Sequence, residues 1–271
     1  NTREEIEAMI QKTGKADRLG LIYIETPANP TNTIIDIKMC AEISAKHKNG
    51  NDRTYLCVDN TYMGPLWSRP MELGADLVVY SATKYIGGHS DLIAGAVLTT
   101  AQIMPRVKAL RTFLGNMVSP HTAWLMLRSM ETLKIRMERQ ATSAEKVATY
   151  LSEHPKVDKV HYLGLIEEND PQYTLYKQQY DSPGAMISFN IKGGEKEAFQ
   201  FLNNLSLIQL AVSLGSTESL AQHPSTMTHC AVSENEREKM GVTSSLIRVS
   251  IGVEDADDLI KDVEQALASV R

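Results

Sequence analysis

The chain has 271 residues, of which 42% are hydrophobic, and this is enough to form one large or two medium domains with buried cores. The net charge is -5 and no stripe of basic and aromatic residues occurs, so we expect no nucleic-acid partner. The three cysteines form no CxxC pair, which favours a reducing compartment. No apolar run is long enough to span a bilayer, and the first residues do not have the pattern of a signal peptide. We therefore expect a cytoplasmic protein without membrane contact.

Residues 1 to about 100 alternate between helical and strand patterns. Thr2 to Glu5 is a plausible capping box for a helix that runs to Lys12. Asp36 is expected to cap the next helix. The expected strands are Leu19–Glu25, Tyr55–Asp59, Leu77–Tyr80 and Ala94–Leu98. Apolar strands separated by helices are typical of a mostly parallel sheet, an α/β arrangement in which ligands bind outside the carboxyl ends of the strands.

The region from Gln102 to Glu153 is almost entirely helical in pattern, with Ser119 as an expected N-cap. Its apolar residues recur at helical spacing, and we expect them to be core: Met104, Val107, Leu110, Leu114, Trp124, Leu127 and Met130. The long helix after Thr132 is expected to lead into a second domain. We therefore place a large domain at residues 1–132 and a smaller one at 133–271.

The second half is expected to be an α+β domain with helices on one side of a few strands. A helix is expected at Glu195–Asn203, and Asp255 is expected to cap a final helix that ends near Val270. The expected strands are Val157–Leu163, Ala185–Ile191, Leu207–Leu210 and Leu246–Ser250.

Lys84 is the first candidate catalytic residue. It follows a buried strand, stands after the hydroxyls of Ser81 and Thr83, and precedes Gly87 and Gly88. A lone lysine in such a place is usually a solvated loop residue, but hydroxyls can hold a phosphate and glycines let the backbone approach a ligand. A buried lysine amine with a carboxylate at the end of a neighbouring strand is the arrangement that a pyridoxal phosphate enzyme needs.

Asp59 supplies that carboxylate, because it ends the strand that begins at Tyr55. A strand-end Asp often only caps a helix or forms a turn, but beside a pyridine ring it would keep the ring nitrogen protonated. Ser81 and Thr83 would donate to the cofactor phosphate, and their alternative role is ordinary hydrogen bonding within the turn.

Two further residues are candidates for positioning and substrate binding. Asn29 lies in a turn whose backbone is restricted by Pro27 and Pro30, which suits a residue that must hold its position. Without other residues to support a role, it would be interpreted as an ordinary loop residue. Arg248 interrupts an apolar strand, where a buried guanidinium needs a partner. A substrate carboxylate and an internal salt bridge both satisfy that need.

Other kinds of site find little support. His223, His229 and Cys230 lie close in sequence, but no second cluster has metal-ligand spacing, so we expect no metal site. The chain has no GxGxxG after a strand, no GxxxxGK[ST] and no GxSxG, so neither nucleotide binding nor serine-hydrolase chemistry is predicted.

Four stretches, in order along the chain, resemble the Cys/Met metabolism family of pyridoxal phosphate enzymes. They are Glu25–Pro30, Val58–Thr61, Ser81–His89, and Ser213–Gly215 together with Pro224–His229. The resemblance covers almost the whole chain. It implies an aspartate-aminotransferase-like fold, with a large cofactor domain and a smaller C-terminal domain, and a homotetramer built from dimers that share active sites.

The resemblance also implies roles for individual residues. Lys84 would form the Schiff base with pyridoxal 5'-phosphate and act as the base, Asp59 would contact the pyridine nitrogen, and Ser81 and Thr83 would bind the phosphate. Asn29 would lie near both the cofactor ring oxygen and the substrate carboxylate. Ser213 and Arg248 would bind that carboxylate.

Two departures from the family pattern affect the functional prediction. The family's N-terminal part, which supplies a phosphate-binding glycine loop, a stacking tyrosine and residues for the neighbouring subunit's site, has no counterpart here, so we expect a segment upstream of residue 1. At Val212, members that handle cystathionine tend to place a glutamate, whereas methionine γ-lyases place an apolar residue. The predicted reaction is therefore γ-elimination from methionine. γ-Replacement on an activated homoserine, γ-elimination from cystathionine, and a non-catalytic binding protein on the same fold are the alternatives.

Overall fold

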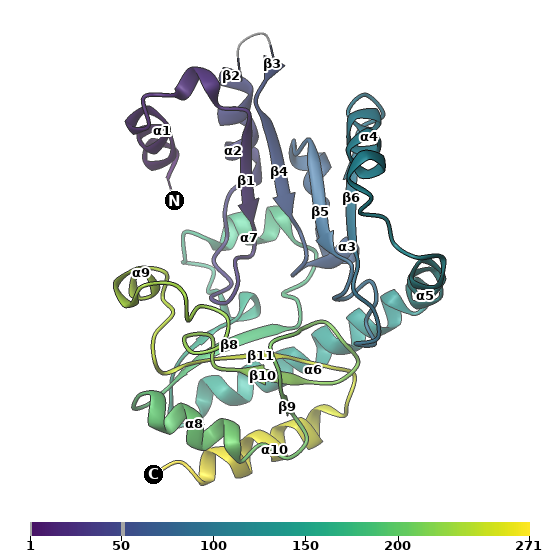
Figure 1. Cartoon of the computed structure of the whole chain (residues 1–271). Helices are drawn as coiled ribbons and strands as arrows, with labels where there is room; N and C mark the ends of the chain where they lie inside the picture. Colours follow the sequence, from purple (N-terminus) through teal and green to yellow (C-terminus); the bar gives the residue numbers. More distant parts are fainter. Residues whose placement is uncertain (1, 50–51) are drawn as a thin grey trace.

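The computed structural model describes residues 2–49 and 52–271 and contains one main sheet in each half of the chain (Figure 1). The first half carries α1 (Arg3–Lys12), η1 (Ala16–Arg18), β1 (Leu21–Glu25), α2 (Ile37–Lys46), β2 (Lys48–Asn49), β3 (Asp52–Arg53), β4 (Tyr55–Asp59), α3 (Gly64–Trp67), η2 (Pro70–Leu73), β5 (Leu77–Ser81), β6 (Gly95–Thr99), α4 (Met104–Leu114) and α5 (Pro120–Met130), where η denotes a 3-10 turn.

The second half begins with the longest described helix, α6 (Leu133–Glu153). It is followed by β7 (Val157–His161), η3 (Leu163–Leu165), α7 (Tyr173–Gln179), β8 (Met186–Ile191), α8 (Glu195–Asn203), β9 (Gln209–Leu210), β10 (Leu220–Gln222), α9 (Glu234–Lys239), β11 (Leu246–Ser250) and α10 (Ala256–Ala268).

The first sheet has the strand order β1-β4-β5-β6. The first three strands are parallel and β6 is antiparallel to β5, so the predicted mostly parallel sheet is confirmed. Helix α2 packs against β1 and β4, and its buried Ile37 and Cys40 join a core with Leu56 and Val58 from β4. The parallel arrangement brings the carboxyl ends of β1, β4 and β5 to one edge.

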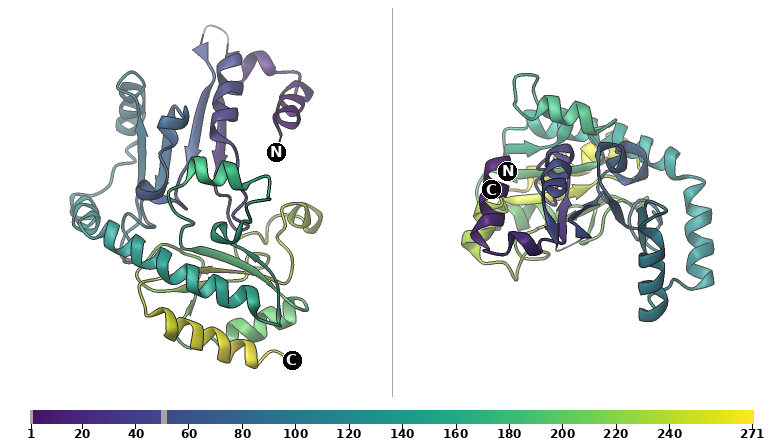
Figure 2. Two further views of the ribbon diagram at one scale, coloured as in Figure 1. Left: turned by 180° about the vertical axis from the view of Figure 1, so that it is seen from behind. Right: turned by 90° about the horizontal axis from the view of Figure 1, so that it is seen from above.

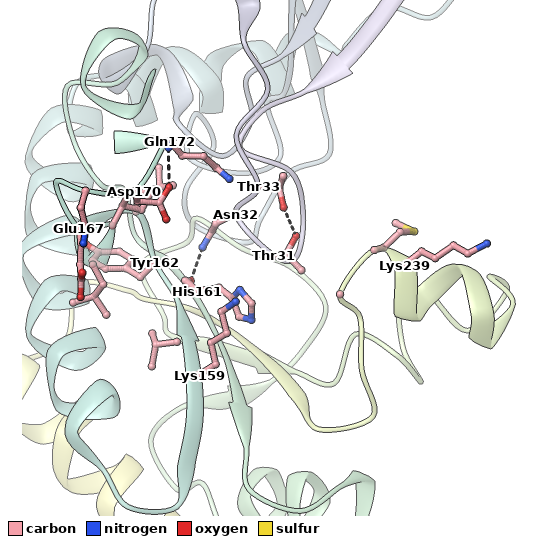
Figure 3. Close-up of a pocket in the computed structure, with 17 residues that line it drawn as sticks. Thr31, Asn32, Thr33, Lys159, His161, Tyr162, Glu167, Asp170, Gln172 and Lys239 are labelled. Atoms are coloured by element: carbon pink, nitrogen blue, oxygen red, sulfur yellow. Dashed lines mark hydrogen bonds between the residues drawn. The ribbon is translucent and has the colours of Figure 1, made fainter. Parts of the chain in front are cut away.

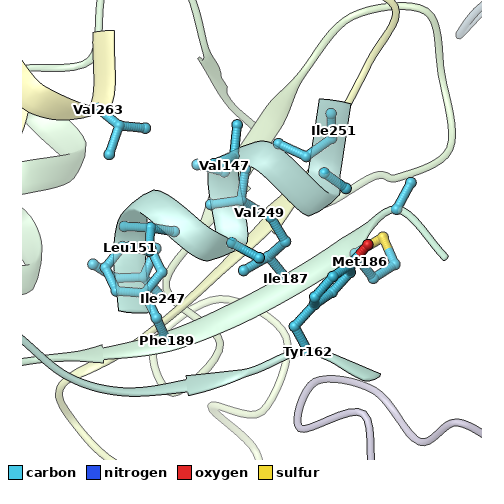
Figure 4. Close-up of a cluster of buried hydrophobic side chains, with 14 of the residues drawn as sticks. Val147, Leu151, Tyr162, Met186, Ile187, Phe189, Ile247, Val249, Ile251 and Val263 are labelled. Carbon is cyan, nitrogen blue, oxygen red and sulfur yellow. The ribbon is translucent and has the colours of Figure 1, made fainter. Parts of the chain in front are cut away.

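The second sheet has the order β7-β8-β11-β10-β9 and is antiparallel except between β9 and β10. Helices α6, α8 and α10 cover one of its faces, as the α+β prediction requires (Figure 1). Between α6 and the sheet, Val147 and Leu151 pack with Ile187, Phe189 and Val249 (Figure 4). Alternation of strand side chains and the 3.6-residue helical period place these apolar faces together.

The predicted helix caps are confirmed. Thr2 and Glu5 form the capping box of α1, and the side chains of Asp36, Ser119 and Asp255 accept backbone N–H groups in the first turns of α2, α5 and α10. These local signals are readable because each cap needs only a side-chain oxygen within three residues of an orphan donor.

Several predicted element bounds were too wide. The first strand begins at Leu21 rather than Leu19, the strand from Val157 ends at His161 because Leu163 lies in η3, and the strand predicted from Leu207 is only Gln209–Leu210. Helices α7 and α9 and strand β10 were missed; they are short, and their sequences carry little periodicity.

The core prediction for α4 and α5 was wrong. Leu110 and Leu114 are 61% and 73% exposed, and Trp124, Leu127 and Met130 are exposed as well, while Met104 and Val107 are half-buried. The reason is visible in the arrangement: α4 and α5 stand out from the side of the body, and among the apolar residues of these helices only Met126 packs against one of the two described cores (Figure 2). Several exposed large apolar residues on adjacent helices are typical of an interaction surface.

Candidate functional site

The candidate site begins at the edge where the parallel strands end. Glu25 pairs with Asp59 across β1 and β4, and Asp59 pairs with Val79 across β4 and β5, which places Ser81 just beyond. The sheet therefore brings Glu25, Asp59 and the turn that carries Lys84 to the same edge. Sequence reasoning expected this convergence from the parallel topology alone.

The Lys84 turn is closed by backbone hydrogen bonds. Lys84 N donates to Ser81 O at 3.0 Å, and Gly88 N donates back to Lys84 O at 2.7 Å. The amine Nζ donates to Ser213 Oγ at 3.1 Å. Burial, with a further contribution from the positive charge of Arg248, lowers the pKa of Lys84 below its ordinary value. A larger fraction of this amine is therefore neutral, and nucleophilic, than at an exposed lysine.

Arg248 is 2% exposed and lies in the middle of β11, between β8 and β10. Its Nη1 donates to Asn29 Oδ1 at 3.1 Å, and its Nη2 donates to Val212 O at 2.8 Å and to Ser213 O at 2.9 Å. These acceptors are neutral, and no carboxylate in the described ranges lies within ion-pair distance, so the salt-bridge alternative is not found there.

Two of the five N–H groups of Arg248 remain unused, one on Nη1 and the one on Nε. Its Nε is buried and makes no hydrogen bond that meets the usual geometry within the described residues, and the buried hydroxyl of Tyr62 lies close enough for the Arg248 charge to act on it. A buried unpaired donor costs free energy, and native proteins rarely leave one without a purpose. Because the side chain is held on Nη1 and Nη2 by protein oxygens, the guanidinium is oriented before any anion arrives.

The Asp59 carboxylate is fixed by its neighbours. Oδ1 accepts from Thr61 N at 3.0 Å and from Thr61 Oγ1 at 2.6 Å, while Oδ2 accepts from Tyr23 OH at 3.0 Å. Thr61 Oγ1 also accepts from Ser81 N at 2.9 Å, which ties the Asp59 turn to the Lys84 turn. Sequence reasoning missed Thr61 and Tyr23. A threonine two residues after a strand-end Asp is a detectable turn signal, whereas Tyr23 is found only through the pairing of β1 with β4.

The two proposed phosphate ligands differ in their present contacts. Ser81 is half-buried at the end of β5. The Thr83 hydroxyl donates to Ala94 O at 3.2 Å and accepts from Ala94 N at 3.0 Å, so it holds the turn against the segment that enters β6. Thr83 would have to exchange its bond to the Ala94 carbonyl in order to donate to a phosphate.

Asn29 is held from both sides. Its backbone N–H donates to Glu25 Oε1 at 3.1 Å, and its side-chain oxygen accepts from Arg248. Burial is the main cause that raises the pKa of Glu25, with Asp59 adding to it. The Val212 side chain is 51% exposed, and only its carbonyl contacts Arg248. Asn29, Ser213, Val212 and Arg248 thus form one cluster with Lys84.

Two other features lie outside this cluster. His223 is buried and both ring nitrogens are engaged, Nδ1 with Thr226 Oγ1 and Nε2 with Ser244 O. A cavity of about 670 Å³ opens between the turn that carries Thr31 and Thr33, strand β7 and the segment after it, and its wall includes Asn32, whose side chain donates to His161 O (Figure 3). No residue of the Lys84 cluster lines this cavity.

The cluster fits the chemistry of pyridoxal phosphate. It offers a lysine amine with a lowered pKa for the aldehyde, a carboxylate fixed at the end of the adjacent strand for the pyridine nitrogen, and a pre-oriented guanidinium with a spare buried donor for a substrate anion.

Comparison with known proteins identifies the family. The model of the Cys/Met metabolism PLP-dependent enzyme family matches residues 1–268. This chain belongs to that family. Among curated proteins, the L-methionine gamma-lyase of Pseudomonas putida is 46% identical over 91% of this chain, and that of Fusobacterium nucleatum subsp. polymorphum is 44% identical over 92%. The human cystathionine gamma-lyase is 45% identical over 91%.

Solved structures of family members share the fold. The structure titled metB from Corynebacterium glutamicum superposes with a TM-score of 0.89 at 40% identity, covering 98% of this chain and 66% of the other. The cystathionine gamma lyase CalE6 from Micromonospora echinospora gives 0.85 at 38% identity, covering 92% and 64%. The predicted aspartate-aminotransferase-like fold is therefore confirmed. The chain spans less than two thirds of its first curated relatives, 62% of the Fusobacterium enzyme and 61% of the Pseudomonas enzyme.

Proposed function

We propose that this family member acts as a pyridoxal phosphate-dependent carbon–sulfur lyase, which converts L-methionine and water into methanethiol, ammonia and 2-oxobutanoate. The observation that carries the proposal is the contact of Lys84 Nζ with Ser213, whose carbonyl is bound by the buried Arg248. It joins an amine suited to an aldehyde with a guanidinium suited to an amino-acid carboxylate. The match to methionine gamma-lyases supports the choice of reaction.

Lys84 is proposed to hold the cofactor aldehyde through Nζ, with Asp59 at the pyridine nitrogen and Ser81 and Thr83 at the phosphate. When bound, pyridoxal phosphate supplies an electron sink next to the substrate α carbon. Lys84 Nζ, once free, accepts a proton from the α carbon, because its lowered pKa leaves it neutral more often than an exposed lysine. It then moves protons at the β carbon so that the γ-thiolate can leave.

Arg248, Ser213 and Asn29 are proposed to bind the substrate carboxylate. The unused N–H groups on Nε and Nη1 of Arg248 are the donors available for it. Val212, with its half-exposed apolar side chain, is proposed to contact the side chain of methionine. A methionine side chain offers no amino group for an acid to bind, so an apolar neighbour suits it better than the glutamate of cystathionine-handling relatives.

The second candidate is γ-replacement or cystathionine γ-elimination on the same site. It is favoured by the 45% identity to human cystathionine gamma-lyase and by the likeness to the metB structure. Assays of methanethiol release from methionine, and of cystathionine formation from cysteine and an O-acylhomoserine, separate the two. Turnover in the replacement assay, with no 2-oxo acid formed from methionine, would reject the first proposal. A non-catalytic binding protein would remain colourless with pyridoxal phosphate and turn over neither substrate.

The organisation of the molecule is also part of the proposal. We propose a large cofactor domain at residues 1–132 and a small domain at 133–271. The support is a buried cluster that lies within residues 1–132 and a second one built mainly from residues 133–271, which also includes five residues of the first half, Ile34, Tyr62, Met63, Trp67 and Tyr85. We propose assembly into a homotetramer, supported by the exposed apolar surface of α4 and α5. A cytoplasmic location is proposed from three cysteines that form no disulfide. Within the described residues, no helix combines the length and apolarity that a membrane crossing needs.

A further inference from the structure

Arg136 is an unusual residue for its place in the fold. It is 5% exposed and lies in the first turn of α6, where the positive end of the helix dipole disfavours a cation. No carboxylate among the described residues lies within ion-pair distance of it. Burial lowers its pKa. A buried cation in an unfavourable position is kept only where its hydrogen bonds serve a purpose.

One of those hydrogen bonds goes to the segment that follows Lys84, and the other two go to the end of α5 and to the residue that precedes α6. Arg136 Nη1 donates to Tyr85 O at 3.0 Å, Nη2 donates to Ser129 O at 3.0 Å, and Nε donates to Thr132 Oγ1 at 3.2 Å. Gly88, with φ of +67°, lies so close that a Cβ there would fall 1.9 Å from Arg136 Nη1. The guanidinium therefore occupies the space beneath the Lys84 turn that a side chain at position 88 would fill.

One turn further along α6, Gln140 contacts the opposite side of the site. It is fully buried, and its Nε2 donates to Ser216 O at 2.8 Å and to Ile251 O at 3.1 Å. Ser216 follows Ser213, which accepts from Lys84. The two loops are also joined directly, since Thr217 N donates to Gly88 O at 3.0 Å.

Between these two residues, Met137 packs against the turn that follows Asp59. A Cβ at Gly64 would lie 2.8 Å from Met137 Cε, and Met137 is fully buried. The first two turns of α6 thus contact three site-bearing segments, which carry Lys84, Asp59 and Ser213.

We infer that the N-terminal half of α6 sets the relative positions of these three segments, with Arg136 and Gln140 as positioning residues that act through the Lys84 turn and the Ser213 loop. The inference rests on the proposed function for its catalytic meaning. In structural terms, the distance between Lys84 Nζ and Ser213 Oγ depends on α6, although this helix contacts neither atom. A planar fork with fixed donors suits this role better than a lysine would.

The test compares Arg136→Met with Lys134→Met in the full chain. Lys134 lies two residues away on the same helix, is 72% exposed in its side chain, and makes only a surface pair with Glu138 at 3.7 Å. Hydrogen exchange is measured at the amides of Gly88 and Thr217, which bond to Lys84 O and Gly88 O. We expect exchange about 10- to 100-fold faster at both in Arg136→Met and unchanged in Lys134→Met.

The second readout is capture of pyridoxal phosphate at Lys84, fixed by borohydride and located by mass spectrometry. A merely structural role is excluded with Val263→Ala, which opens a cavity beneath α10, a helix that carries no residue of the Lys84 cluster. We expect capture to fall in Arg136→Met and to be retained in Val263→Ala at equal loss of stability. Normal exchange and normal capture in Arg136→Met, or an equal fall in Val263→Ala, would overturn the inference.

Two further variants test the positioning role of Arg136 if Arg136→Met does not fold. Gly88→Ala keeps the arginine but displaces its guanidinium, and should accelerate exchange in the same two amides. Arg136→Lys keeps the positive charge and part of the hydrogen bonding, and should accelerate exchange at these amides to an intermediate degree. Exchange at the wild-type rate in both Gly88→Ala and Arg136→Lys would refute the inference. Failure of wild-type Lys84 to capture the cofactor would reject the proposed function, while the exchange data would still decide the role of α6.

Discussion

Replacing Arg248 with Met removes the group that we propose binds the substrate carboxylate. The guanidinium makes three hydrogen bonds of 2.8–3.1 Å to protein oxygens, and its Nε and one N–H of Nη1 are the donors left for an anion. A charge-assisted pair with a carboxylate contributes about 2–3 kcal/mol, which corresponds to about 30- to 150-fold in binding. Arg248→Met should therefore weaken amino-acid binding by about that factor.

The assay compares L-methionine with L-methioninol, which lacks the carboxylate, by calorimetric titration of the cofactor-loaded chain. The wild type should prefer methionine by about 30- to 150-fold, and Arg248→Met should lose this preference. Unfolding in urea gives the control for stability, because the variant also leaves the oxygens of Asn29, Val212 and Ser213 without their donor. A folded Arg248→Met that still prefers methionine as strongly as the wild type would refute the reasoning.

Three further predictions concern different parts of the molecule. The pKa of Lys84 is lowered in the folded chain, so the unfolded chain binds more protons at this residue. The free energy of unfolding of the wild type, relative to that of Lys84→Met, should therefore rise with pH through the window below 10.5 when it is measured by urea unfolding. A fall with pH would contradict the burial argument. Val212→Glu should shift the ratio of cystathionine to methionine turnover toward cystathionine, and an unchanged ratio would remove Val212 from the specificity argument. Phe113→Ser with Leu114→Ser, at positions 85% and 73% exposed, should reduce self-association in sedimentation without lowering the unfolding midpoint; undiminished association would locate the interface elsewhere.

The local parts of the site were predictable from the sequence. Lys84 follows an apolar strand and has hydroxyls before it and glycines after it, while Asp59 is the last residue of a second apolar strand. The parallel pairing of the two strands then brings their carboxyl ends together. Helix caps such as Asp36 were equally readable, because a cap depends on residues three positions apart.

The contacts made by Arg248 were not predictable. The sequence identifies a buried arginine in an apolar strand, but its acceptors come from Asn29, 219 residues away, and from the Ser213 loop. Nothing local distinguishes these neutral oxygens from an acid. Arg136 escaped notice for the same reason, since two of its three acceptors are the backbone carbonyls of Tyr85 and Ser129, and backbone groups have no sequence signature.

The error at α4 and α5 has a different cause. Helical periodicity shows which face of a helix is apolar, but it does not show whether anything covers that face. Leu114 and Trp124 have the spacing of core residues and are 73% and 56% exposed in the described chain. The same pattern is thus compatible with a core and with a surface that binds another polypeptide.

The most direct test of the central claim is to incubate the chain with pyridoxal 5'-phosphate, reduce it with borohydride and locate the added mass by peptide mapping. The loaded protein should be yellow and should lose this colour on reduction. One reduced phosphopyridoxyl group is expected on Lys84, and none in Lys84→Ala. A chain that takes up no cofactor, or that carries it on another lysine while Lys84 stays unmodified, would contradict the assignment.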